Sequence, residues 1–113
     1  MEYLRWTENH AISAVSQRVW ERYSSCNLST DYCYTTDLVL MPFAVAATDE
    51  KGYRPDSIMK RLAQYANTHG TWYAQDNGDG DSWNVWVILK IDNSEYHFTW
   101  TVWQSNGFIR GVY

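Results

Sequence analysis

Residues 83–103 hold two runs in which apolar and polar side chains alternate, separated by the turn-forming stretch DNSE (92–95). Alternation with a period of two predicts antiparallel strands over 83–92 and 96–103. With Asn93 and Ser94 in the turn, every pair on one side of this hairpin is apolar. These pairs are Ile91–Tyr96, Leu89–Phe98, Val87–Trp100 and Val85–Val102. A one-residue slip would destroy the match, so we expect this side to be the core face.

Two more strands and two helices complete the predicted fold. Strands are expected over 71–75 and 108–113, next to the turns DNGDGDS and QSNG. Apolar side chains at spacings of three and four predict helices over 8–24 and 57–69. Thr7 is the expected N-cap of the first helix, and Gly70 ends the second. The fold class is therefore α+β, with two helices packed on one face of a four- to five-stranded antiparallel sheet.

Residues 38–47 (LVLMPFAVAA) are apolar at both odd and even positions. This pattern predicts a buried strand, in which Pro42 would require a sheet edge or a bulge. A short helix that begins at Pro42 is the alternative.

The length of 113 residues predicts a single domain that spans 1–113. Cys26 and Cys33 either form a disulfide or remain two free thiols, and their spacing allows both. The N-terminal stretch MEYLRWTENH has no apolar core typical of a signal peptide, and the run 38–47 is too short to cross a bilayer. We therefore expect a cytoplasmic protein with no membrane association.

Negative charge is concentrated in one segment. Residues 76–95 contain five carboxylates and one lysine. The net charge of this segment is therefore −4, the same as that of the whole chain. Such a surface repels phosphates, so nucleic acid is not expected as a direct ligand. It favours encounter with a basic protein, although the charge can also serve solubility alone.

The stretch DNGDGDSWNVW (76–86) does not have the spacing of a calcium loop. In the register that begins at Asp76, glycines occupy the third and fifth ligand positions, and in the register that begins at Asp79 the fifth is Trp83. The three histidines have no metal-ligand partners at suitable spacing. No motif indicates a catalytic residue or a cofactor. We therefore expect no metal and no cofactor, and a binding role is favoured over an enzymatic one.

Tryptophans are expected to form a row near the acidic turn. If residue 75 faces residue 83, Trp72 lies opposite Trp86, and Trp103 lies on the diagonal from Trp86. The predicted partner-binding residues are Trp72, Trp86, Trp103, Asp76, Asp79 and Asp81. The alternative is that residues 38–47 or the N-terminus cover this row as a second small core.

Three functions are compatible with these features. The favoured one is a stoichiometric inhibitor or neutraliser of a basic macromolecular partner, in the way that small acidic immunity and anti-defence proteins act. The first alternative is a small-molecule pocket or a small-substrate enzyme with aromatic walls and His97. The second is a self-associating structural module, in which the terminal strand FIRGVY offers a free edge for a homodimer.

Overall fold

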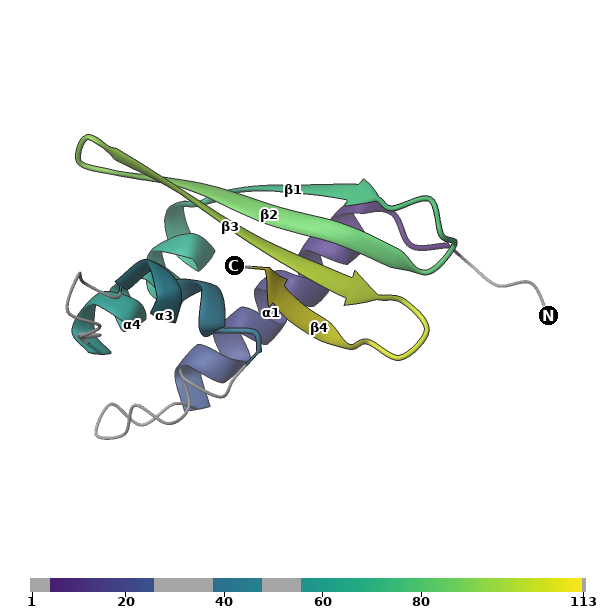
Figure 1. Cartoon of the computed structure of the whole chain (residues 1–113), viewed down its shortest axis with the longest axis horizontal. Coiled ribbons are helices and arrows are strands. Elements are labelled where there is room, and N and C mark those ends of the chain that lie inside the picture. Colours follow the sequence, from purple (N-terminus) through teal and green to yellow (C-terminus); the bar gives the residue numbers. More distant parts are fainter. Residues whose placement is uncertain (1–4, 26–37, 48–55, 113) are drawn as a thin grey trace.

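A four-stranded antiparallel sheet forms one layer of the protein, and helices form the other (Figure 1). The strands are β1 (Thr71–Asp76), β2 (Ser82–Ile91), β3 (Ser94–Trp103) and β4 (Ile109–Val112). They lie side by side in sequence order. The computed structural model describes residues 5–25, 38–47 and 56–112, of which 56–59 are described for the backbone only. The α+β class is confirmed, with four strands.

Three helices, rather than the predicted two, are present in the described residues. They are α1 (Glu8–Ser25), α3 (Met41–Ala47) and α4 (Asp56–His69). All three contact the sheet and lie on one side of it in Figure 1. The predicted N-cap is confirmed, because the Thr7 hydroxyl accepts a hydrogen bond of 3.2 Å from the N–H of His10.

The additional helix, α3, occupies the segment for which a strand was the first prediction. Pro42 stands in its first turn, where the fixed φ of proline suits a helix and its missing N–H is not needed. Phe43, Ala44 and Ala47 are buried, whereas Val45 is exposed. The short helix therefore explains why both odd and even positions of this segment are apolar.

The register of the β2–β3 hairpin differs from the prediction by two residues. Ile91 pairs with Ser94, Leu89 with Tyr96 and Val87 with Phe98. The two-residue turn is Asp92-Asn93, and Asp92 takes a left-handed φ of 54°. A shift of two residues preserves which side chains share a face, so the predicted core face is confirmed although its pairs were wrong.

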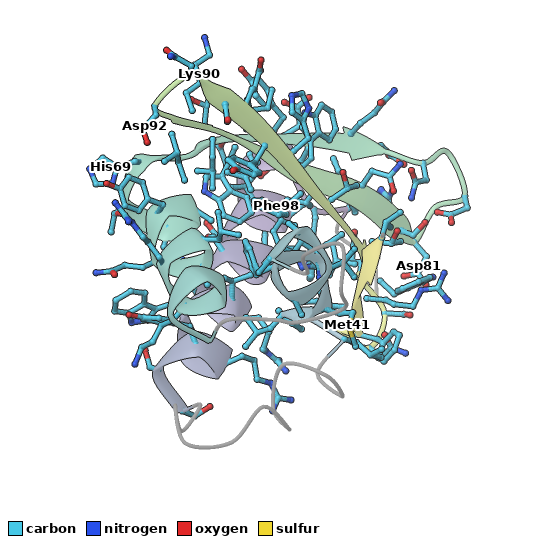
Figure 2. The ribbon with its side chains drawn as sticks, turned by 60° about the vertical axis from the view of Figure 1, so that its left-hand side comes forward. Met41, His69, Asp81, Lys90, Asp92 and Phe98 are labelled. Atoms are coloured by element: carbon cyan, nitrogen blue, oxygen red, sulfur yellow. The ribbon has the colours of Figure 1, made fainter. Side chains whose placement is uncertain are left out.

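One hydrophobic core lies between the sheet and the helices. Trp100 is fully buried at its centre, and its indole N–H donates to the carbonyl of Val39 at 2.7 Å. Phe43 of α3 packs on Phe98 and Trp100 with ring centroids 4.6 and 5.6 Å apart. Figure 2 shows Phe98 between the sheet and the helices.

The predicted alternatives for Cys26 and Cys33, a disulfide or two free thiols, concern residues that lie outside the described part of the chain. Among the described residues, no helix is long and apolar enough to span a membrane.

Candidate functional site

The face of the sheet that points away from the helices is the candidate site. On this open face, Tyr73 of β1, Trp86 of β2, Thr99 of β3 and Val112 of β4 lie in one row across all four strands. The rings of Tyr73 and Trp86 stack with centroids 5.6 Å apart and an interplanar angle of 19°. Tyr73 is 42% exposed and Val112 is 48% exposed. We call these four residues the aromatic row.

A second aromatic contact lies on the open face near the end of β3. Trp103 and Phe108 pack with ring centroids 5.6 Å apart. The N–H of Trp103 donates to the carbonyl of Phe108 at 2.9 Å, so the turn between β3 and β4 fixes this pair. Phe108 is 45% exposed. Trp103 pairs with Ser82, so it does not lie on the diagonal from Trp86 as predicted, but it does lie on the predicted face.

The predicted position of Trp72 is wrong. Trp72 pairs with Val87 and therefore points to the core face, because β1 is shifted by one residue from the expected register. Its ring stacks on Trp100 with centroids 5.5 Å apart, and its indole N–H donates to the carbonyl of Ala66 at 2.8 Å. Tyr73 takes the place beside Trp86 that was predicted for Trp72.

The physical cause of this shift is the loop between β1 and β2. The N–H of Asn77 donates to the carbonyl of Ser82 at 3.1 Å, which makes Asp76 the partner of Trp83. Gly78 and Gly80 both take left-handed φ angles, of 80° and 79°, which a side chain would disfavour. The turn-forming residues predict a loop here. They do not determine how many residues on each side stay paired in the sheet, so they do not fix the register of β1 against β2.

Asp79 organises the acidic loop. Its carboxylate accepts hydrogen bonds from the N–H of Asp81 at 2.9 Å and from the N–H of Ser82 at 2.7 Å. It also accepts one of 2.5 Å from the Ser82 hydroxyl. These bonds, above all that from the Ser82 hydroxyl, lower the pKa of Asp79 to about 2. Asp79 therefore keeps its charge over the physiological range.

Asp76 is bound by a residue that sequence reasoning did not identify, Arg5. The guanidinium donates to both carboxylate oxygens, at 2.5 and 3.2 Å. The N–H of Gly78 donates to the same carboxylate at 2.8 Å. The Gly78 bond and then the Arg5 bond lower the pKa of Asp76. Arg5 neutralises much of the charge of Asp76. This carboxylate therefore attracts a basic partner less strongly than Asp79 does.

Asp81 joins the acidic loop to the β3–β4 turn. Its side chain accepts hydrogen bonds from the N–H and the hydroxyl of Ser105, at 2.7 and 2.8 Å. Its carbonyl accepts the N–H of Gln104 at 2.8 Å. The loop is thus held beside Trp103 and Phe108. Figure 2 shows Asp81 at one end of the sheet and Lys90 at the other.

A hollow of about 370 Å³ lies at the Lys90 end of the open face. It is lined by His69, Thr71, Tyr73, Ile88, Lys90 and Glu95. A ring nitrogen of His97, Nε2, lies 3.2 Å from Glu95 Oε1. The hollow combines a cation, a carboxylate and an aromatic wall.

The remaining histidines are engaged by aromatic rings. His10 stacks on Trp6 with centroids 4.5 Å apart, and His69 stacks on Tyr65 at 4.8 Å. Within the described ranges, no group of three histidine, cysteine or acidic side chains is arranged to hold a metal ion.

Comparison with protein-family models, with curated proteins and with solved structures gave no match for this chain. A function is therefore inferred from the geometry of the open face.

Proposed function

We propose that the chain is a stoichiometric protein-binding module that docks its open sheet face onto a basic partner and so inhibits or neutralises it. The observation that carries this proposal is the aromatic row, in which Tyr73 and Val112 are exposed and Trp86 is partly exposed on the sheet. No described helix packs against this face. Exposed apolar patches of this kind mark interaction surfaces more often than not.

The pair of Trp103 and Phe108 extends the apolar surface toward the acidic loop. Tryptophan and tyrosine supply large contact areas and are enriched among residues that dominate binding energy. The polar row between the two aromatic groups contains Asn84 and Thr101, whose side chains are 3.3 Å apart and hydrogen-bonded. Because these two side chains already hydrogen-bond each other, covering them with a partner costs less free energy of desolvation.

Charge at one end of this surface supports a basic partner. Asp79 and Asp81 accept hydrogen bonds from uncharged donors, so their negative charges are not cancelled there. Complementary charge steers encounter and raises the association rate more than it raises the affinity. An inhibitor of a basic macromolecule, of the immunity or anti-defence type, requires both the apolar surface of the open face and the negative charge of the acidic loop.

A capture experiment with matched variants tests the proposal. The wild-type protein, a Tyr73→Ser/Trp86→Ser double variant and a Trp20→Ser control are immobilised and exposed to lysate of the source cells. Trp20 is a suitable control because it is 46% exposed on α1, on the helical side. We expect one basic protein to be retained by wild type and control and lost by the double variant. Equal retention by all three contradicts docking through the open face.

The role of charge is tested separately with the partner so identified. Asp81→Asn keeps an acceptor for the Ser105 N–H and removes one charge beside Trp103. Glu21→Gln removes one charge from α1 and is the control. We expect Asp81→Asn alone to slow association and to weaken its dependence on salt. Identical association rates for the two variants would contradict steering by the acidic loop.

The hollow at the Lys90 end favours a second candidate function, the binding of a small molecule. Lys90 and Glu95 are paired neighbours on β2 and β3, and Tyr73 supplies an aromatic wall. A ligand with both charges and an apolar part fits this lining. Thermal stabilisation by a member of a metabolite panel, lost in Lys90→Gln, would favour this function over protein docking.

A further inference from the structure

The hollow of about 370 Å³ at the Lys90 end of the open face has an apolar side and a charged side. Ile88 of β2 lies between them. Tyr73 bounds the hollow toward the aromatic row, and Lys90 and Glu95 bound it toward the turn between β2 and β3. Ligand pockets in proteins begin at about 300 Å³, so a hollow of this size suits a small ligand.

The two charges of the lining are neighbours that do not pair with each other. Lys90 and Glu95 lie directly opposite on β2 and β3, where side chains are close enough to interact. Glu95 instead lies 3.2 Å from Nε2 of His97, and because a carboxylate can only accept, the imidazole N–H donates to it. Among the described residues, the Lys90 ammonium has no hydrogen-bond or ion-pair partner. The lining therefore holds a cation and an anion that remain available to a ligand.

His69 adds a fixed acceptor to the lining. The Thr68 hydroxyl donates to the carbonyl of Gln64 at 2.9 Å, so its oxygen accepts in the 2.7 Å contact with Nδ1 of His69. The neutral ring therefore carries its proton on Nδ1 and offers Nε2 as an acceptor. Tyr65 stacks on this ring with centroids 4.8 Å apart. Figure 2 shows His69 and Lys90 at the same end of the sheet.

The apolar side of the hollow is held in place by the aromatic row. Tyr73 stacks on Trp86, and 42% of Tyr73 remains exposed. Along β2, Trp86 and Lys90 are four residues apart, which corresponds to about 13 Å. A ligand that lies over Ile88 can therefore touch the aromatic side and the charged side at once, if one of its ends is apolar and the other is charged.

We propose that the hollow binds a zwitterionic α-amino acid with a large apolar side chain, which rests on small-molecule binding, the second candidate function. The carboxylate of the amino acid meets the Lys90 ammonium. Its ammonium meets Glu95, of which Oε1 alone contacts His97. Its side chain lies over Ile88 and against Tyr73.

The balance of charge in the lining selects a zwitterion. Lys90 and Glu95 cancel each other in sum, so a ligand that is only an anion is attracted by Lys90 and repelled by Glu95. A ligand that is only a cation meets the reverse situation. A ligand that carries both charges on adjacent groups meets a complementary charge at each, and an α-amino acid is the smallest such molecule that also carries an apolar side chain.

The test is an NMR titration of the full chain with L-phenylalanine and with three analogues that each lack one group. Phenylalanine amide lacks the carboxylate, N-acetylphenylalanine lacks the ammonium, and glycine lacks the apolar side chain. We expect L-phenylalanine to shift the backbone amides of Lys90 and Glu95 saturably in the millimolar range. Each analogue should bind about threefold more weakly or worse, because exposed charge pairs contribute modestly. Equal affinity for all four compounds, or no saturable shift with L-phenylalanine, would overturn the proposal.

Matched variants assign each charge of the ligand to its partner. In Lys90→Gln, the difference between L-phenylalanine and phenylalanine amide should disappear. In Glu95→Gln, the difference between L-phenylalanine and N-acetylphenylalanine should disappear. Arg110→Gln is the control, because Arg110 is an exposed cation that pairs with Thr101 and does not line the hollow. It should keep both differences. A difference that persists in the variant expected to remove it contradicts the assignment, and all three substituted residues are exposed, so the variants are expected to fold.

Failure of the amino-acid assignment is distinguishable from failure of the proposed function. If a metabolite of another class stabilises the protein and Lys90→Gln removes that effect, small-molecule binding stands and the amino acid is the wrong ligand. Capture of a basic protein through Tyr73 and Trp86 requires no ligand in the hollow, so its result is independent of this titration.

Discussion

Gly111 of β4 lies against the ring of Pro42 in α3. A Cβ atom on Gly111 would come within 2.5 Å of the proline Cγ and Cδ and within 2.8 Å of the carbonyl of Leu38. The N–H of Gly111 donates a hydrogen bond to the same carbonyl of Leu38. The contact joins the last strand to the segment that precedes α3, and only a residue without a side chain permits it.

Gly111→Ala should therefore destabilise the fold by about 1–3 kcal/mol, since the added methyl forces apart two backbone segments. Gly107→Ala is the comparison. Gly107 has a φ of 71°, and a Cβ added there would meet no described atom within 4 Å beyond its chain neighbours. Its substitution carries backbone strain alone, about 1 kcal/mol. Urea unfolding measures both, and a loss at Gly111 no larger than that at Gly107 would contradict the close approach.

The two buried tryptophans of the central strands should respond differently to the same substitution. Trp100 donates its indole N–H to Val39, whereas the indole N–H of Trp83 is buried and has no partner among the described residues. Trp100→Phe removes packing and the hydrogen bond that the indole N–H donates to Val39, at a cost of about 2–4 kcal/mol. Trp83→Phe removes an unpaired donor together with the packing, so it should cost about 1–2 kcal/mol less. Equal losses in chemical denaturation would contradict this difference.

The acidic loop should make stability depend on pH in acid. The pKa of Asp79 is about 2 in the folded protein and 3.8 when unperturbed. A lowered folded pKa means that the unfolded chain binds the proton more tightly, so stability is fully present above about pH 4 and is lost as pH falls toward 2. Ser82→Ala removes the largest cause of the shift. NMR titration should then show the Asp79 midpoint moving up toward 3.8; an unchanged midpoint would contradict the role of the hydroxyl.

The faces of the central hairpin could be predicted from sequence, because alternation of side chains is insensitive to a shift of two residues. The paired residues could not, because the turn Asp92-Asn93 rather than Asn93-Ser94 sets them. For β1 the shift was one residue, and that reversed its faces. Trp72 therefore lies in the core against Trp100, and Tyr73 occupies the position beside Trp86 that was predicted for Trp72.

The candidate site was predictable to a similar extent. Trp86, Trp103 and the acidic loop do lie on or beside the open face, as alternation and turn residues indicated. Arg5 could not be found, because its contact with Asp76 joins residues 71 positions apart. The helix α3 was uncertain for a physical reason: a short apolar segment with one proline satisfies the requirements of an edge strand and of a first helical turn equally well.

The turn at Asp92 gives the last prediction. Its φ of 54° is unfavourable for most side chains, tolerable for aspartate and free of strain for glycine. Asp92→Gly should change stability little or raise it by up to about 1 kcal/mol, whereas Asp92→Val should lower it by about 1–2 kcal/mol. Asn93→Gly is the control, because Asn93 does not have a left-handed φ and glycine gains nothing there. Thermal unfolding measures all three. A stable Asp92→Val variant would mean that the hairpin tolerates a different turn, and cross-strand NMR contacts between Leu89 and Phe98 in place of Leu89 and Tyr96 would identify it.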